Sequence, residues 1–284
     1  MGSYFKRWGG SEVAKHGRTG KEYAVGALFV AALVVAANVA FGNVVNKGVD
    51  AVFDAFKERG QLKVSEQNWP LRPVCDGATS VAMPNNLPGV KDVPMTAIKS
   101  DARNWVLENG GAAWGDGTLT LTLSTTHSAT AHVLSMTPVI FERSQEPPQW
   151  ALVTEGGCGD VYARYFDLDL SARKPVLTDR GIVGSPTTDS GEAEPVPVGE
   201  TFTVSAVDPA RITIGAASCS QSAKWGLEIR YTTSDRDPTD IQTLSLGSSA
   251  KPFIVLGGTA PAYAIDWEDS SRLTPRPDAT DCRE

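Results

Sequence analysis

The chain has 284 residues, of which 41% are hydrophobic and 21% are charged, a balance that excludes an intrinsically disordered protein. Its formal net charge is −7, but residues 1–22 carry +3 (five basic against two acidic residues), whereas residues 61–284 carry −10 (18 basic against 28 acidic). Because affinity for nucleic acid comes from clustered lysine and arginine, the acidic main part argues against DNA or RNA as a partner.

The first predicted element is a transmembrane helix at Tyr23–Phe41, a segment of 19 residues without a charge. A helix of this length spans about 28 Å, close to the roughly 30 Å of a bilayer's hydrocarbon core. The basic tail, residues 1–22, precedes the segment, so the positive-inside rule predicts a cytoplasmic N-terminus. We therefore expect a single-pass protein of the cell membrane, with the lipid bilayer as a partner and the main domain outside the cytoplasm.

Two other interpretations of this segment were considered. A cleaved signal peptide would use the small residues of Val35–Ala37 or Asn38–Ala40, but the apolar run exceeds the roughly 7–15 residues of such peptides. A buried core helix rarely runs this long without a polar face. The membrane anchor and the signal peptide both place the main domain outside.

Small residues within the predicted span could support helix association. Ala32, Ala36 and Ala40 recur every four residues, and Asn38 lies among them. Small residues at this spacing let two helices approach closely, and an asparagine can hydrogen-bond across the interface. A homo-oligomer through the transmembrane helix is one interpretation; the other is that alanine is common in apolar helices.

Residues 42–60 follow as a predicted amphipathic stalk helix. One face carries apolar side chains and the rest of the circumference carries charges of both signs. Gly60 is well placed to end the helix. The apolar face consists of Val45, Val49, Val52, Phe53 and Phe56.

Residues 61–270 are predicted to be a mainly β, antiparallel sandwich-like domain, built as one domain or two. The clearest strand is Thr118–Leu123, whose sequence TLTLTL alternates strictly. The absence of strand–helix alternation argues against a doubly wound fold. Residues 181–199 are predicted to be a loop, and residues 271–284 an irregular tail. Further strands are predicted at Ala131–Arg143, Val161–Leu170, Thr201–Val207, Arg211–Ala217, Gly226–Thr233, Gln242–Leu246, Pro252–Leu256 and Tyr263–Trp267.

All four cysteines, Cys75, Cys158, Cys219 and Cys282, follow the membrane segment. An even number in an oxidising compartment predicts two disulfides, and three pairings are possible. We favour Cys75 with Cys158 and Cys219 with Cys282, which would fix the tail; free buried thiols are the alternative. Because no two cysteines are close in sequence, a structural zinc site is disfavoured.

Four segments carry a further pattern: VLSMTPVIFERS, GGCGDVYARYFDLDL, ETFTVSAVDPARITIGAASCSQSAKWGLEIRY and AKPFIVLG. Within them Cys219 is followed shortly by Trp225 and an alternating strand. Over roughly residues 70–265 this resembles a group of uncharacterised actinobacterial membrane-anchored proteins, which implies a membrane helix before an extracytoplasmic β domain and implies no activity. Similar chains carry a second cysteine beside the one before the tryptophan; here only Cys219 is present, so its partner must come from elsewhere.

Motifs for chemistry are sparse. Asp235, Asp237 and Asp240 in six residues predict either a solvated hairpin turn or a calcium site, since Ca²⁺ needs several hard oxygens. His127 and His132 are five residues apart, so on one regular strand they would face opposite sides. No phosphate loop or nucleophile elbow is present.

The aromatic and acidic clusters add two further interpretations. Trp105, Trp114 and Trp150 near predicted loops suggest a ligand surface, whereas Trp225 and Trp267 are expected in the core. Paired carboxylates, such as those in the acidic cluster at residues 266–269, could serve a glycosidase.

The sequence predicts no catalytic residue, no metal and no cofactor. The leading hypothesis is a non-enzymatic interaction or sensing module that recognises an envelope protein or a cell-wall component. The alternatives are an envelope hydrolase acting on glycans and a structural subunit of a membrane assembly.

Overall fold

The computed structural model describes residues 59–70, 79–153, 163–183, 202–266, 269 and 271–279. All of them belong to the unit Arg59–Glu284, because the chain divides after Glu58. The predicted transmembrane helix, and the predicted stalk helix apart from Arg59 and Gly60, lie outside the described residues. Among the described helices, none has both the length and the apolar character needed to cross a membrane.

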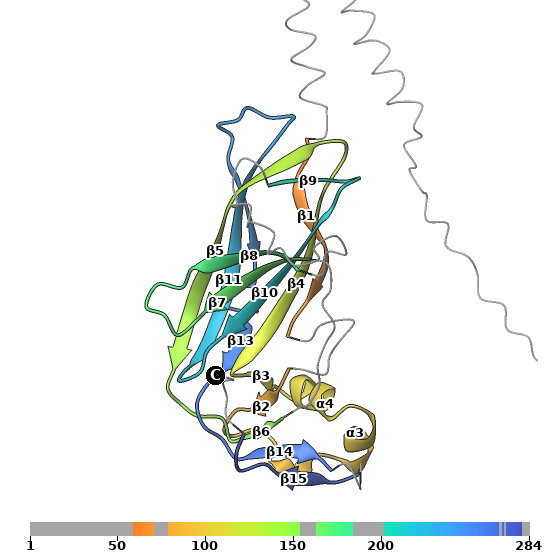
Figure 1. Ribbon diagram of the computed structural model, residues 1–284, viewed down its shortest axis with the longest axis vertical. Coiled ribbons are helices and arrows are strands. Elements are labelled where there is room, and N and C mark those ends of the chain that lie inside the picture. Colours follow the sequence, from red (N-terminus) through yellow and green to blue (C-terminus); the bar gives the residue numbers. More distant parts are fainter. Residues whose placement is uncertain are drawn as a thin grey trace, which may run out of the picture. The chain divides into compact units, whose positions relative to one another are not determined.

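The described chain is mainly β, as predicted, and its strands form two sheets (Figure 1). In the five-stranded sheet the interior strand β4 contains the predicted TLTLTL run. The leucines of this run are completely buried, while the alternating threonines face away from them, so the period of two is confirmed. In spatial order this sheet contains β1 (Leu62–Asn68), β4 (Asp116–Thr125), β10 (Ala210–Ala217), β7 (Ala163–Asp169) and β8 (Leu177–Val183).

The second sheet has ten strands, of which β5 and β11 are the longest. They pair antiparallel from Ala131 with Thr233 to Ser144 with Ser222. The spatial order is β15 (Leu273–Pro275), β14 (Ala262–Ile265), β6 (Trp150–Leu152), β2 (Val81–Met83), β3 (Ala112–Trp114), β13 (Phe253–Leu256), β11 (Ser222–Thr233), β5 (Thr130–Ser144) and β9 (Thr203–Ser205), with β12 (Gln242–Leu246) also paired to β11.

The two sheets pack face to face over one hydrophobic core that contains buried residues of β4, β7, β10, β5, β11 and β13. Its largest side chain is Trp225, which is completely buried, as expected from the sequence. The Trp225 ring meets Phe253 at 5.1 Å and the edge of Trp69 at 5.6 Å between ring centroids. Edge-to-face aromatic pairs of this kind stabilise a core beyond the area that they bury.

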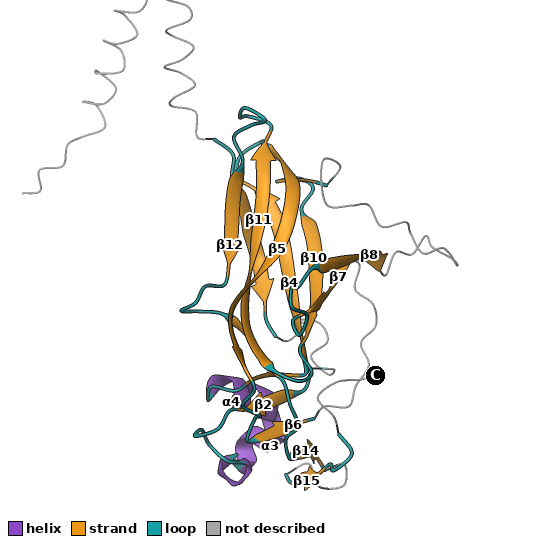
Figure 2. Cartoon of the chain, turned by 90° about the vertical axis from the view of Figure 1, so that its left-hand side faces the viewer, coloured by secondary structure: helices purple, strands orange, loops and turns teal. Residues whose placement is uncertain are grey.

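A small lobe, comprising β2, β3, β6, β14, β15 and two helices, lies beyond one end of the long strands (Figures 1 and 2). The helices α3 (Met95–Ser100) and α4 (Ala102–Glu108) follow the single 3₁₀ turn Val90–Asp92. Asp101 caps α4, since its side chain accepts hydrogen bonds from two backbone N–H groups of the first turn. Residues of both helices pack with β2 and β6 in a second core. Val81 in this core pairs with Ala113 of the main core, so the helices cover the same face of the ten-stranded sheet as the five-stranded sheet does.

Three strand pairs differ from the predicted antiparallel arrangement. The pairs β7–β10, β3–β13 and β6–β14 are parallel. In each pair the intervening chain returns to the end at which the first strand began, so that the second strand runs in the same direction. Leu273–Pro275, predicted to belong to an irregular tail, pairs with β14 as strand β15. Of the predicted loop at residues 181–199, the first three residues belong to β8 and the others lie outside the described residues.

Gly226 lies where β11 changes its partner from β13 to β12, and we expect Gly226→Ala to destabilise the unit by about 1–3 kcal/mol. A Cβ atom there would lie 2.7 Å from the Leu246 carbonyl oxygen and 3.0 Å from the Phe141 ring. Gly215→Ala is the matched control, because its Cβ would meet the movable hydroxyl end of Tyr165 at 2.7 Å. Urea unfolding measures both variants, and equal losses would contradict the backbone clash at Gly226.

Candidate functional site

A groove of about 260 Å³ lies where the long strands meet the small lobe. Its floor is the outer face of the ten-stranded sheet, because its floor residues Lys224 and Ile254 alternate with core-facing neighbours along β11 and β13. One wall is the turn after β2, and another is the segment that links β5 to β6. The lining residues are Pro84, Asn85, Asn86, Gly110, Ala112, Glu142, Ser144, Glu146, Pro147, Pro148, Ser222, Ala223, Lys224, Ile254 and Leu256.

Strand register aligns side chains across the floor. Glu142, Lys224 and Ile254 form one such row across β5, β11 and β13. In this row the Lys224 Nζ donates to Glu142 Oε2 at 2.7 Å. Both side chains remain about half exposed, at 41% and 54%, so this cross-strand pair contributes little stability but neutralises both charges.

Asn85 holds the opposite wall together. Its Nδ2 group donates to Glu146 Oε1 at 2.9 Å and to the Pro147 carbonyl at 3.1 Å. The turn places Asn86 at φ 66°, in the left-handed region that asparagine tolerates better than most residues. A second positive φ, 92° at Gly110, follows the end of helix α4 beside the groove.

This groove holds two carboxylates, the residue type that a glycosidase would need. Glu142 and Glu146 both line it, but a glycosidase acid is a protonated carboxyl held in an apolar setting. Glu142 is instead half exposed and ion-paired with Lys224. The groove therefore offers hydrogen-bond acceptors, the side-chain amides of Asn85 and Asn86, and apolar side chains of β13 beside the charged pair.

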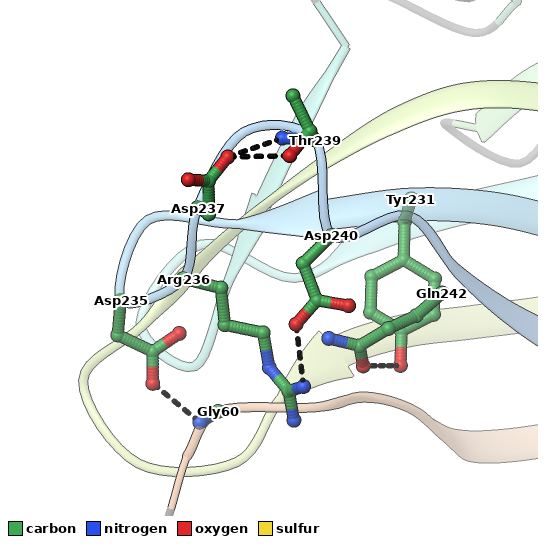
Figure 3. A network of polar contacts seen from close by, with 8 residues as sticks. All are labelled: Gly60, Tyr231, Asp235, Arg236, Asp237, Thr239, Asp240 and Gln242. Atoms are coloured by element: carbon green, nitrogen blue, oxygen red, sulfur yellow. Dashed lines mark hydrogen bonds and ion pairs between the residues drawn. The ribbon is translucent and has the colours of Figure 1, made fainter. Parts of the chain in front are cut away.

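The acidic loop between β11 and β12 does not form the calcium site that its spacing allowed (Figure 3). Asp235 accepts from the Gly60 N–H at 2.6 Å, whereas Asp237 accepts from the Thr239 N–H at 2.9 Å. Asp240 pairs with Arg236 at 3.0 Å. The three carboxylates thus face three different partners, and no cluster within the described residues could hold a metal ion. In this arrangement the aspartates fix the hairpin, the first of the two interpretations of their spacing.

The loop between β11 and β12 also contacts the first described residues of the unit. Gly60 is buried against Ala129, where a Cβ atom would lie only 2.2 Å from the Ala129 Cβ. Gln61 adds two hydrogen bonds to Thr126, at 2.9 Å each. Burial raises the pKa of Asp235, but hydrogen bonding from the Gly60 N–H and the nearby Arg236 charge lower that pKa below its usual range.

Asp235→Ala is therefore expected to lower the free energy of unfolding by about 1 kcal/mol at neutral pH, because it leaves the Gly60 N–H without its acceptor. A carboxyl whose pKa is depressed by folding stabilises above its unfolded pKa and loses that contribution as the pH falls through the folded pKa. The difference between variant and parent should therefore shrink below about pH 4. Asp235→Asn, which keeps an acceptor oxygen, is the control. Urea unfolding at several pH values would contradict this account if the alanine penalty stayed constant.

Two of the three tryptophans that were predicted to form a ligand surface are buried. Trp114 and Trp150 are each only 2% exposed, and the N–H of each indole donates to a backbone carbonyl, at Gly258 and Pro88 respectively. Trp105 is partly buried against the second core. These tryptophans pack the small lobe, which sequence position near loops did not reveal. Trp267 lies outside the described residues.

The remaining predicted site residues are dispersed. Cys219 is disulfide-bonded, and the other three cysteines lie outside the described residues, so their pairing stays a prediction. His127 occupies the β4–β5 turn at φ 57°, whereas His132 lies within β5, opposite Thr232 of β11. Ala32, Ala36, Asn38 and Ala40 also lie outside the described residues. Asp266 and Asp269 accept hydrogen bonds within the turn between β14 and β15.

Sequence reasoning missed the groove, because its lining comes from five segments that are separate in the chain. The Glu142–Lys224 pair joins residues 82 positions apart. Only two local signals pointed there: the turn-forming pair Asn85–Asn86, and Pro147–Pro148, which prevents β5 from continuing.

The chain was compared with family models, with curated proteins and with solved structures, and no match was found in any of the three. The resemblance to actinobacterial membrane-anchored proteins therefore stays a prediction. The groove is the feature of the described unit from which a function can be proposed.

Proposed function

We propose that the protein is a membrane-anchored, extracytoplasmic binding module whose ligand occupies the groove. The anchor is the uncharged segment Tyr23–Phe41, and the basic tail before it sets the orientation. The ligand is a component of the envelope, either another protein or cell-wall material.

The observation that carries this proposal is the distance between the groove and the point where the chain enters the unit. Gly60 lies against Ala129, at the beginning of β5, and Ser144 at the end of β5 lines the groove. A strand of 15 residues at about 3.3 Å per residue is roughly 45 Å long. The paired strands β5 and β11 therefore form an arm between Gly60, the buried residue at the start of the unit, and the groove. Such an arm suits a module that reaches away from its anchor.

Site-specific photocross-linking tests this function. A photoreactive amino acid replaces Asn86 at the exposed rim of the groove in the full chain, expressed in the cells that produce it. The control position is Thr243, which is exposed on β12 and outside the groove. We expect an adduct from position 86 and none from position 243. No adduct from position 86, or equal adducts from both, would overturn the binding function.

The hydrolase alternative has one observation in its favour, the presence of two carboxylates in the groove. It predicts that glycan turnover is lost in both Glu142→Gln and Glu146→Gln. The assembly alternative predicts a stable oligomer in mild detergent, measured by light scattering, whereas a monomer would exclude it.

A further inference from the structure

The groove contains one carboxylate that no cation compensates. Of its three charged side chains, Glu142 and Lys224 neutralise each other. Glu146 accepts a hydrogen bond from the neutral Asn85 amide, and no cation of the described residues lies within ion-pair distance of it. The groove therefore presents a net negative charge at a fixed position.

Glu146 is held in this position before any ligand arrives. Asn85 uses its Nδ2 group on both the Glu146 carboxylate and the Pro147 carbonyl, which fixes the side chain against the wall. The Glu146 backbone N–H in turn donates to the Ser144 hydroxyl at 3.1 Å. A carboxylate fixed in advance loses less freedom on binding, which favours a charge-assisted hydrogen bond with a ligand.

Apolar side chains also line the groove that contains this carboxylate. Ile254 and Leu256 belong to β13, and Pro147 lies in the wall that carries Glu146. Apolar surface of this kind accommodates the methylene stem of a long side chain while its charged end reaches a polar group. The volume of about 260 Å³ is smaller than that of most sites for drug-sized ligands, so the groove suits one side chain and its flanking backbone.

Building on the proposed binding function, we infer that the groove binds a peptide segment through a side chain ending in a primary ammonium group. The aliphatic stem lies along Ile254 and Leu256, and the ammonium group donates to Glu146. The net charge of −10 over residues 61–284 draws such a cation toward the unit.

The test is titration of the full chain, in detergent micelles at 150 mM salt, with Nα-acetyl-lysine methylamide. NMR monitors the Asn85 side-chain amide and the Gly110 backbone amide, both in the groove lining. We expect saturable shifts of these signals and a five- to tenfold weaker affinity, roughly the value of one charge-assisted hydrogen bond, in Glu146→Gln. The neutral norleucine analogue should bind the parent chain about as weakly as the lysine probe binds that variant.

Glu228→Gln is the matched control, because Glu228 is an exposed carboxylate on β11 outside the groove lining. It should bind the lysine probe like the parent chain. Equal binding of both probes, unaffected by Glu146→Gln, would overturn the ammonium ligand and leave the groove as a binding site. Shifts only outside the groove, or none at all, would also overturn the ligand class, and the adduct at position 86 would still decide the binding function separately.

Discussion

Replacing Trp225 by alanine is expected to lower the free energy of unfolding by about 3–5 kcal/mol. The Trp225 side chain is completely buried and touches the rings of Trp69 and Phe253, so its removal leaves a cavity between the two sheets. For a unit of this size the midpoint of thermal unfolding should fall by roughly 10 °C. Far-UV circular dichroism of the full chain in mild detergent measures the change.

Trp225→Phe separates packing from hydrogen bonding. The Trp225 indole N–H is buried without a hydrogen-bond partner, so phenylalanine removes an unsatisfied donor while keeping an aromatic ring. We expect it to retain most of the stability that alanine loses. A phenylalanine variant as unstable as the alanine variant would show that the aromatic cluster is not the source of the effect.

Asp179→Ala is expected to destabilise the unit by about 3–5 kcal/mol, because it strands a nearly buried charge. The Arg164 side chain is 9% exposed and pairs with Asp179 between β7 and β8. Its guanidinium lies 4.9 Å from the centre of the Phe202 ring, away from solvent. Without Asp179 this cation has no anionic partner among the described residues.

The double variant Arg164→Met with Asp179→Leu is the informative control. Replacing a buried pair by apolar residues of similar size is often neutral, so we expect most of the lost stability to return. Hydrogen exchange should show the loss in Asp179→Ala at the amides of β8, since β7 is its one partner among the described strands. Full protection of β8 in the single variant, or a double variant as unstable as the single one, would contradict the stranded-charge account.

Long, alternating strands were predictable from the sequence. Thr118–Leu123 lies inside β4, and the predicted Gln242–Leu246 coincides with β12. In both cases the period of two sets which side chains face the hydrophobic core, and the pattern is long enough to be read locally. The same holds for Trp225, whose place in an alternating strand indicated the core.

The small lobe could not be predicted in the same way. Strands β2, β3 and β6 have three residues each, too few to show a period, and all their side chains are buried. Helices α3 and α4 have six and seven residues, and they depend on packing against the sheet more than on their own propensity. Trp114 and Trp150 are buried only because this lobe forms over them.

The groove was beyond sequence reasoning for a related reason. Glu142 meets Lys224 through strand register, and Asn85 reaches Glu146 only after β2 joins the second sheet through β3 and β6. The aspartates of the β11–β12 loop show the opposite limit. Their spacing allowed calcium, but Asp235 binds Gly60, which is 175 residues away in the chain, and Asp240 pairs with Arg236.

We propose that the β unit lies outside the cytoplasm, where the groove meets its ligand. Val207 is 94% exposed in the turn between β9 and β10, so Val207→Cys presents an accessible thiol. In intact cells a membrane-impermeant maleimide should label Val207→Cys at once and should label Ser3→Cys, in the basic tail, only after lysis. The parent chain gives the background. Labelling of Val207→Cys only after lysis would contradict the claim, because the unit would then lie on the inner side of the membrane.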